Sequence, residues 1–184
     1  MARTAKNPYK KHAMVFAKNK ERTIIVERTG DNVYISEGFS MLRIPYIYYE
    51  FYIMPLSPLF VALEDEQKAT REGKSEIPTI GYSDGSLARI FDNANATLDT
   101  TVTPFLYDAS ECAHNIRLVQ VGNRLAQYND TYLSAAMEYA IAFNATNDRH
   151  PVLKFEDEIG VGCIIMAVNN KSCNADLETL RKFL

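Results

Sequence analysis

The sequence contains no tryptophan and only three cysteines among its 184 residues. Cys112, Cys163 and Cys173 are odd in number and lack metal-ligand spacing, so they predict neither a disulfide framework nor a zinc site, and reduced thiols indicate a cytoplasmic protein. No apolar run reaches the roughly 20 residues of a membrane-spanning helix. The longest apolar region, 44–63, is interrupted by Pro and Glu. The basic start has no hydrophobic stretch behind it, so we expect no signal peptide and no membrane partner.

Recognisable catalytic patterns are also missing. The three histidines, His12, His114 and His150, stand in unrelated contexts. No phosphate-binding loop, Gly-x-Ser-x-Gly or His-Glu-x-x-His pattern occurs. The acidic run Glu156-Asp157-Glu158 offers oxygen ligands for a divalent cation, and the alternative is an acidic turn in solvent, which we favour. We therefore expect a protein that is not an enzyme and that uses no metal or cofactor.

Charge is distributed unevenly along the chain. The formal net charge is −3, yet residues 1–28 carry eight Lys and Arg residues against two Glu, so the remainder is acidic. A basic segment can contact nucleic-acid phosphates, which positions a protein on its ligand without reading sequence. The alternative is an exposed, solvated chain end. The candidate nucleic-acid contacts are Lys6, Lys10, Lys11 and Lys18.

The first half of the chain predicts two helices separated by strands. Apolar spacing behind Asn7-Pro8 favours an amphipathic helix over 7–20. Helical turns over 47–54 end at Pro55, and the polar run 64–76 predicts a connecting loop. Between the two helices, turn residues separate three apolar or β-branched segments, which we expect to be strands over 22–28, 33–36 and 41–44.

Aromatic residues crowd the segment 46–52. At helical spacing such residues usually belong to a core. The alternative is an exposed surface that binds a protein partner or stacks on single-stranded bases. The candidate partner-surface residues are Tyr46, Tyr49 and Tyr52.

The second half predicts hairpins and one long helix. Ser83-Asp84-Gly85-Ser86 is a hairpin signal between expected strands over 78–82 and 87–91. Gly122-Asn123 is a second hairpin signal. Asn129-Asp130-Thr131 then offers N-cap residues to a helix whose apolar stripe runs from Tyr132 to Ile141. Further strands are expected over 100–107, 150–156 and 160–168, and a short helix over 174–184.

A weak internal repeat relates the two halves. When Gly38 is aligned with Gly122, each copy reads strand, glycine turn, strand, helix start and then a tyrosine, Tyr48 or Tyr132, that opens an apolar helix. Two such units can join their sheets edge to edge and place both helices on one side. We therefore expect an α+β fold in one compact domain, 1–184, with halves of about 7–63 and 78–168. Chance similarity between hairpins remains the alternative.

The C-terminal section resembles the last subdomain of the bacterial DNA polymerase sliding clamp. In that family a strand ends in an aromatic-Asn pair, an aromatic-aliphatic helix start follows, and an apolar strand closes the subdomain with Met-Pro. Tyr128-Asn129, Tyr132-Leu133 and the closing segment 164–168 match this pattern, although Ala167 stands where the family has proline. The resemblance covers 115–168, and 20–55 faintly.

The resemblance implies a DNA-clamp-like fold with antiparallel sheets and a non-enzymatic role in DNA replication. It would make the chain a processivity factor of phage or mobile-element type, with double-stranded DNA, replication proteins and further copies of the chain as partners. Because the chain is much shorter than a full bacterial clamp, a ring would need more copies. The alternative is a protein-interaction or structural module of the same fold that does not bind DNA.

Overall fold

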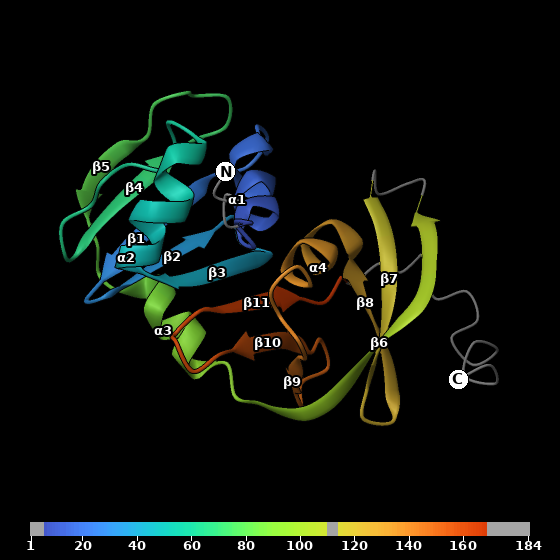
Figure 1. Cartoon of the computed structure of the whole chain (residues 1–184). Coiled ribbons are helices and arrows are strands. Elements are labelled where there is room, and N and C mark those ends of the chain that lie inside the picture. The colour runs from blue at the N-terminus through green and yellow to red at the C-terminus, as the bar shows by residue number, and fades with distance from the viewer. Residues whose placement is uncertain (1–5, 110–113, 169–184) are drawn as a thin grey trace, which may run out of the picture.

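A single antiparallel sheet of eleven strands organises the fold (Figure 1). The computed structural model describes residues 6–109 and 114–168. The strands are β1 (Ile24–Thr29), β2 (Asn32–Ser36), β3 (Ser40–Pro45), β4 (Gln67–Arg71), β5 (Thr79–Tyr82), β6 (Ala96–Ala109), β7 (His114–Val121), β8 (Arg124–Asn129), β9 (Asn144–Thr146), β10 (Val152–Glu156) and β11 (Gly162–Met166). The helices are α1 (Lys10–Lys18), α2 (Tyr46–Tyr48), α3 (Ser86–Asn93) and α4 (Asp130–Ala136), with a π-helical turn η1 (Tyr49–Ile53) and a 3-10 turn η2 (Met54–Leu56).

The sheet is arranged around its central pair, β3 and β11. These strands are antiparallel, with Leu42 opposite Cys163, and the full order is β5-β4-β1-β2-β3-β11-β10-β9-β6-β7-β8. A helix followed by three strands occurs on each side of the centre, as α1-β1-β2-β3 and as α4-β9-β10-β11. Gly38 and Gly122 each lie in the turn of a hairpin, β2–β3 and β7–β8. The expected duplication itself stays a prediction.

Helices cover both faces of the sheet. α1 and η1 pack on one face against a core that includes Ile35, and α4 packs on a second core that includes Leu153 and Cys163. Figure 1 shows α1 and α4 side by side on that face, and the two helices contact each other. α3 packs against Tyr34 and its neighbours, and Tyr34 points away from Ile35 because successive strand residues face opposite sides. The one-sided arrangement was expected for the helices of the two repeat units, whereas α3, whose segment was expected to be a strand, covers the other face.

The expected hairpin around Ser83–Ser86 is also wrong. β5 forms as expected, but residues 86–93 are helix α3 rather than a strand. Gly85 adopts a positive φ of 70° before the helix, which suits glycine. The buried Glu27 carboxylate of β1 then accepts the backbone N–H groups of Leu87 and Ala88, at 3.0 and 3.2 Å. A carboxylate at a helix N-terminus is stabilising, so a distant strand determines the local structure.

One unexpected strand and one shorter helix also differ from the sequence expectation. Part of the polar run 64–76 is strand β4, which pairs with β1 and buries Ala69 and Arg71. The helix that begins after Asn129 ends at Ala136, so the predicted apolar stripe does not continue. Ile141, at its expected end, is 97% exposed. The N-cap is confirmed, because the Asn129 side chain accepts the backbone N–H of Thr131 at 2.9 Å.

Several sequence expectations concern parts of the chain that the structure does not describe. The helix expected over 174–184 lies outside the described residues, as do Cys112 and Cys173. In the part of the chain that is described, no helix is long and apolar enough to cross a membrane.

Candidate functional site

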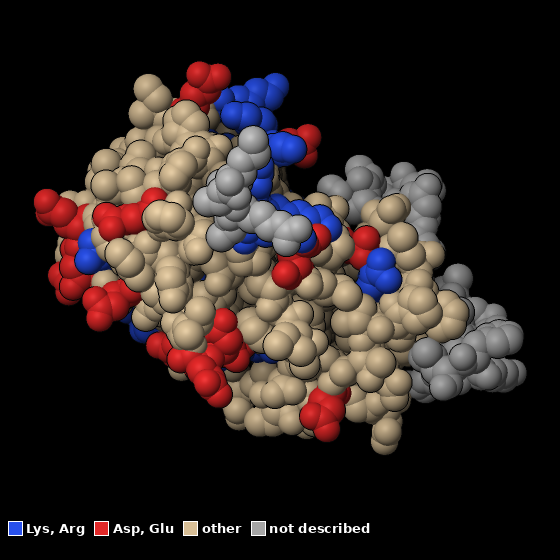
Figure 2. All heavy atoms as spheres, viewed as in Figure 1, with Lys and Arg blue, Asp and Glu red and all other residues tan. Residues whose placement is uncertain are grey.

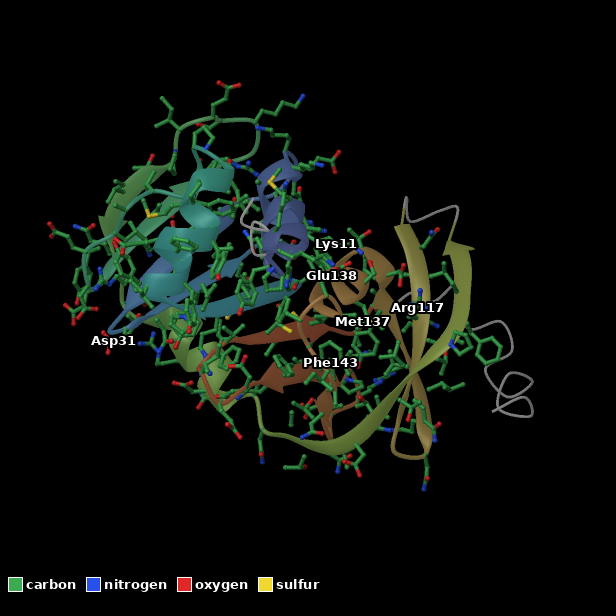
Figure 3. The ribbon with its side chains drawn as sticks, in the orientation of Figure 1. Lys11, Asp31, Arg117, Met137, Glu138 and Phe143 are labelled. Atoms are coloured by element: carbon green, nitrogen blue, oxygen red, sulfur yellow. The ribbon has the colours of Figure 1, made fainter. Side chains whose placement is uncertain are left out.

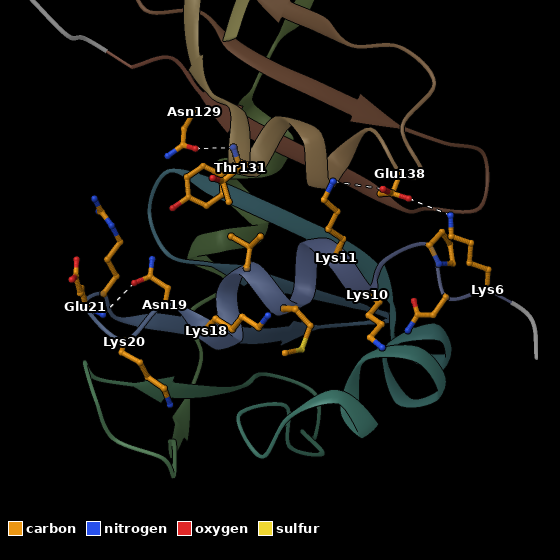
Figure 4. Close-up of a pocket in the computed structure, with 16 residues that line it drawn as sticks. Lys6, Lys10, Lys11, Lys18, Asn19, Lys20, Glu21, Asn129, Thr131 and Glu138 are labelled. Carbon is orange, nitrogen blue, oxygen red and sulfur yellow. Dashed lines mark hydrogen bonds and ion pairs between the residues drawn. The ribbon is translucent and has the colours of Figure 1, made fainter. Parts of the chain in front are cut away.

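A groove of about 1400 Å³ runs between α1 and α4 (Figure 4). Six cationic side chains and two acidic ones line it, and all four lysines predicted from the sequence are among them. We call it the basic groove. Its charged lining residues are Lys6, Lys10, Lys11, Lys18, Lys20, Arg22, Glu21 and Glu138.

The amphipathic pattern of α1 places these lysines on its open side. His12, Ala13, Phe16 and Ala17 are buried, while the lysines of the helix are exposed. Buried Arg71 of β4 holds the end of the helix, because its guanidinium donates to the carbonyl of Ala17 at 2.8 Å and to that of Asn19. A cation at a helix C-terminus satisfies its free carbonyls.

One carboxylate, that of Glu138, engages two of the cations. Its oxygens lie 3.4 Å from Lys6 Nζ and 3.6 Å from Lys11 Nζ (Figures 3 and 4). Lys11 also donates to the Ser134 carbonyl at 3.1 Å, which links α1 to α4. Exposed ion pairs of this kind contribute little to stability, so an incoming anion can exchange with Glu138.

The remaining lysines of the groove are available to a ligand. The side chains of Lys10, Lys18 and Lys20 make no ion pair or hydrogen bond within residues 6–109 and 114–168. Figure 2 shows basic side chains gathered over α1, whereas acidic side chains lie mainly toward the margins of this face. The six cations thus form a concentrated positive surface on a protein whose net charge is negative.

At the far end of the groove, Arg22 is held by two contacts. It lies 3.5 Å from Glu37 and stacks 4.1 Å above the Phe39 ring. The Glu37 carboxylate is buried, and burial raises its pKa despite the N–H groups of Phe39 and Ser40 that it accepts. Burial likewise raises the pKa of Tyr132, on the groove floor, to about 12. Arg22 is therefore partly committed to Glu37, and Tyr132 remains protonated.

Of the three tyrosines predicted to form a partner surface, one is buried and two are half-buried. Tyr49 is fully buried and donates its hydroxyl to the Val61 carbonyl at 2.8 Å, so it offers nothing to a partner. Tyr46 and Tyr52 are half-buried. The Arg28 guanidinium lies 3.6 Å above the Tyr46 ring. The exposed apolar side chains of this segment are Ile47 and Phe51, neither of which was among the predicted surface residues.

Two of the groups that could have suggested catalysis or metal binding, His12 and Asp157, are engaged in the fold. His12 is buried between the Tyr139 hydroxyl and Ser40 Oγ, at 2.7 and 2.8 Å. Asp157 accepts the backbone N–H groups of Ile159 and Val161, so it closes the turn before β11. Within the described part of the chain, no cluster of His, Cys, Asp or Glu could hold a metal ion.

Sequence reasoning missed Lys20, Arg22, Tyr132 and Glu138 as lining residues. The first two belong to the same basic segment as the predicted lysines and could have been selected with them. Tyr132 and Glu138 carry no such signal, since they reach the groove only through the packing of α4 on α1. The chain matches no known protein-family model, and no curated protein is significantly similar to it.

Proposed function

We propose that this chain is a non-enzymatic, DNA-clamp-like accessory protein that binds the phosphate backbone of double-stranded DNA through the basic groove. It associates with copies of itself and serves DNA replication as a processivity factor of phage or mobile-element type. No step of this function requires a cofactor.

The convergence of the predicted lysines in one groove carries the proposal. Lys10 and Lys18 stand eight positions apart on α1, about 12 Å at 1.5 Å per residue. That distance spans three to four phosphates of one strand, at about 3.4 Å each along duplex DNA. The position of these charges along one groove supports contact with phosphates over a merely solvated chain end.

The symmetric arrangement of the sheet also supports a clamp-like protein. Helices α1 and α4 lie together on one face, and each leads into three antiparallel strands that meet at β3 and β11. The resemblance of segment 115–168 to a sliding-clamp subdomain includes α4 and β11, which contribute to this arrangement.

The proposal is tested by fluorescence anisotropy with a labelled DNA duplex at increasing salt concentrations. We expect affinity to fall linearly with salt on a log–log scale, because binding releases counterions. The double variant Lys10→Glu/Lys18→Glu should bind at least about tenfold more weakly and with a shallower salt slope.

Arg149→Glu is the matched control, since Arg149 is exposed in the loop before β10 and does not line the groove. It should bind like the wild type. The double variant changes the net charge by −4 and the control by −2, so a loss in the control about half as large on a logarithmic scale would show that binding follows net charge alone. Wild-type protein that ignores the duplex at low salt would refute the DNA-binding role.

A protein-interaction module is the second candidate, and one observation favours it. Ile47 and Phe51 are large apolar side chains that are 65% and 73% exposed. They stand four positions apart, and contiguous apolar surface commonly marks sites of protein contact. If the duplex test fails, this surface is the one to use in a search for protein partners.

A further inference from the structure

An exposed aromatic ring stands out on η1. Phe51 contacts the Tyr52 ring edge to face, with 4.9 Å between the ring centroids, and most of its own surface remains open. Its neighbours Tyr49 and Ile53 are buried, so the turn anchors Phe51 on a rigid support. Glu50, the only charged residue from 46 to 56, lies close enough to Tyr46 to raise the pKa of that hydroxyl, after burial itself.

A series of contacts joins this ring to the basic groove. The Asn7 side chain, which lines the groove, donates to the Tyr52 carbonyl at 2.6 Å. The Tyr52 ring packs against that of Tyr9, with 5.8 Å between the centroids, and Tyr9 directly precedes Lys10. In Figure 4, Lys10 extends on the side of α1 that faces η1. Helix α1, which carries Lys10, and η1, which carries Phe51, therefore pack against each other.

A positively charged groove beside an exposed aromatic ring suits single-stranded nucleic acid, a polyanion whose bases are unpaired. Phosphates can follow the lysines of α1, while a base lies on the ring, because every nucleobase has a π face. A base within a duplex cannot do this without leaving its stack. We propose that Phe51 stacks on an unpaired base, so that the basic groove and η1 together bind single-stranded nucleic acid as well as duplex.

This inference rests on the proposed phosphate contacts and adds a second class of nucleic-acid substrate to the same groove. An apolar protein partner is the competing occupant, but it does not account for the adjoining cations. Charge complementarity between the six cations and a polyanion favours the nucleic acid.

The test measures binding of a labelled thymidine oligonucleotide and of the duplex by Phe51→Ala, Phe51→Trp and the wild type. Phe51→Ala should weaken oligonucleotide binding about tenfold, as expected when one base–aromatic stack is lost. Its salt slope and its duplex affinity should stay unchanged, because no phosphate contact is removed. Phe51→Trp should retain oligonucleotide binding.

Ile47→Ala is the matched control, because Ile47 is an exposed apolar residue of the same segment without an aromatic ring. It should bind the oligonucleotide like the wild type. Equal oligonucleotide affinity of Phe51→Ala and wild type would overturn the inference and leave the ring to a protein partner. So would equal losses in the two alanine variants.

The two proposals fail separately. Duplex binding without oligonucleotide binding would overturn the stacking role alone. Absence of both would remove the proposed function and this inference together. Circular-dichroism melting of each variant shows whether a loss of binding reflects a loss of fold.

Discussion

At the residue scale, buried His12 joins the two halves of the protein. Its ring connects Tyr139, which follows α4, to Ser40 of β3, while the residue itself belongs to α1. Burial lowers the pKa of His12 to about 3. The neutral ring can donate one hydrogen bond and accept another, which matches two hydroxyl partners.

The depressed pKa of His12 predicts a loss of stability in acid. Between about pH 6.5 and pH 3 the unfolded chain binds a proton at this position and the folded chain does not. The free energy of unfolding should therefore fall by up to about 1.4 kcal/mol for each pH unit across that window. Urea unfolding measured from neutral pH to about pH 4 provides the check.

The variant His12→Gln keeps a hydrogen-bonding side chain but cannot titrate, so its stability should depend less on pH than that of the wild type. His150→Gln alters an exposed histidine and should retain the wild-type dependence. Identical pH profiles for all three proteins would contradict the assignment.

At the scale of elements, α3 packs against the sheet through a glycine. A Cβ atom at Gly162 would lie 2.6 Å from Phe91 Cζ and 2.8 Å from the Phe155 carbonyl. Gly162→Ala should therefore push α3 away from β11 and destabilise the protein by about 1–3 kcal/mol in urea unfolding. In Gly81→Ala the new Cβ would meet nothing within 4 Å, and a change within about 0.5 kcal/mol is expected. Similar effects at both glycines would refute this packing argument.

Elements whose signals are local could be predicted from the sequence. The hairpin around Gly122-Asn123 and the cap at Asn129 depend on neighbouring residues, and both are confirmed. α3 could not be recognised, because the carboxylate at its start comes from Glu27 on β1. β4 was hidden for a similar reason, since its buried Arg71 is polar in the sequence and finds its partners on α1.

The candidate site follows the same rule. Its lysines could be predicted because they lie close together in the chain and carry their charge wherever they fold. Glu138 and Tyr132 come from the other half of the protein, and only tertiary packing brings them to α1. Phe51 could not be distinguished from its buried neighbour Tyr49, because apolar spacing alone does not reveal which side of the helical turn faces solvent.

At the scale of the whole molecule, the sheet formed by residues 6–109 and 114–168 has an open end at β5. The backbone N–H of Ser83 donates to the Glu66 carbonyl at 2.8 Å, just beyond the paired residues of β5 and β4. Hydrogen bonding alternates along an antiparallel strand, so the backbone groups of Thr79 and Gly81 also face β4. The backbone groups of Ile80 and Tyr82 therefore point outward. The side chains of Ile80 and Tyr82 are 53% and 71% exposed. An edge with free hydrogen-bonding groups and apolar side chains favours strand pairing with another chain.

We expect the protein to self-associate through this edge. Size-exclusion chromatography with light scattering should give a mass above that of one chain, and Ile80→Lys should shift it toward the monomer, because edge lysines oppose pairing. Ile159→Lys is the control, since Ile159 is equally exposed but lies in the turn before β11. A wild-type monomer, or the same shift in both variants, would exclude β5 as the interface.

The pairing of β3 with β11 also determines when the protein can fold during its synthesis. Arg43 and Gly160, which hydrogen-bond beside this pair, are 117 residues apart in the chain. When the first half leaves the ribosome, β3 is therefore an unpaired edge strand. Its partner β11 is made only after nearly all of the described residues. Such long-range closure is slow and exposes intermediates to aggregation. We therefore expect nascent chains to keep this edge open to pairing with other chains until synthesis is nearly complete.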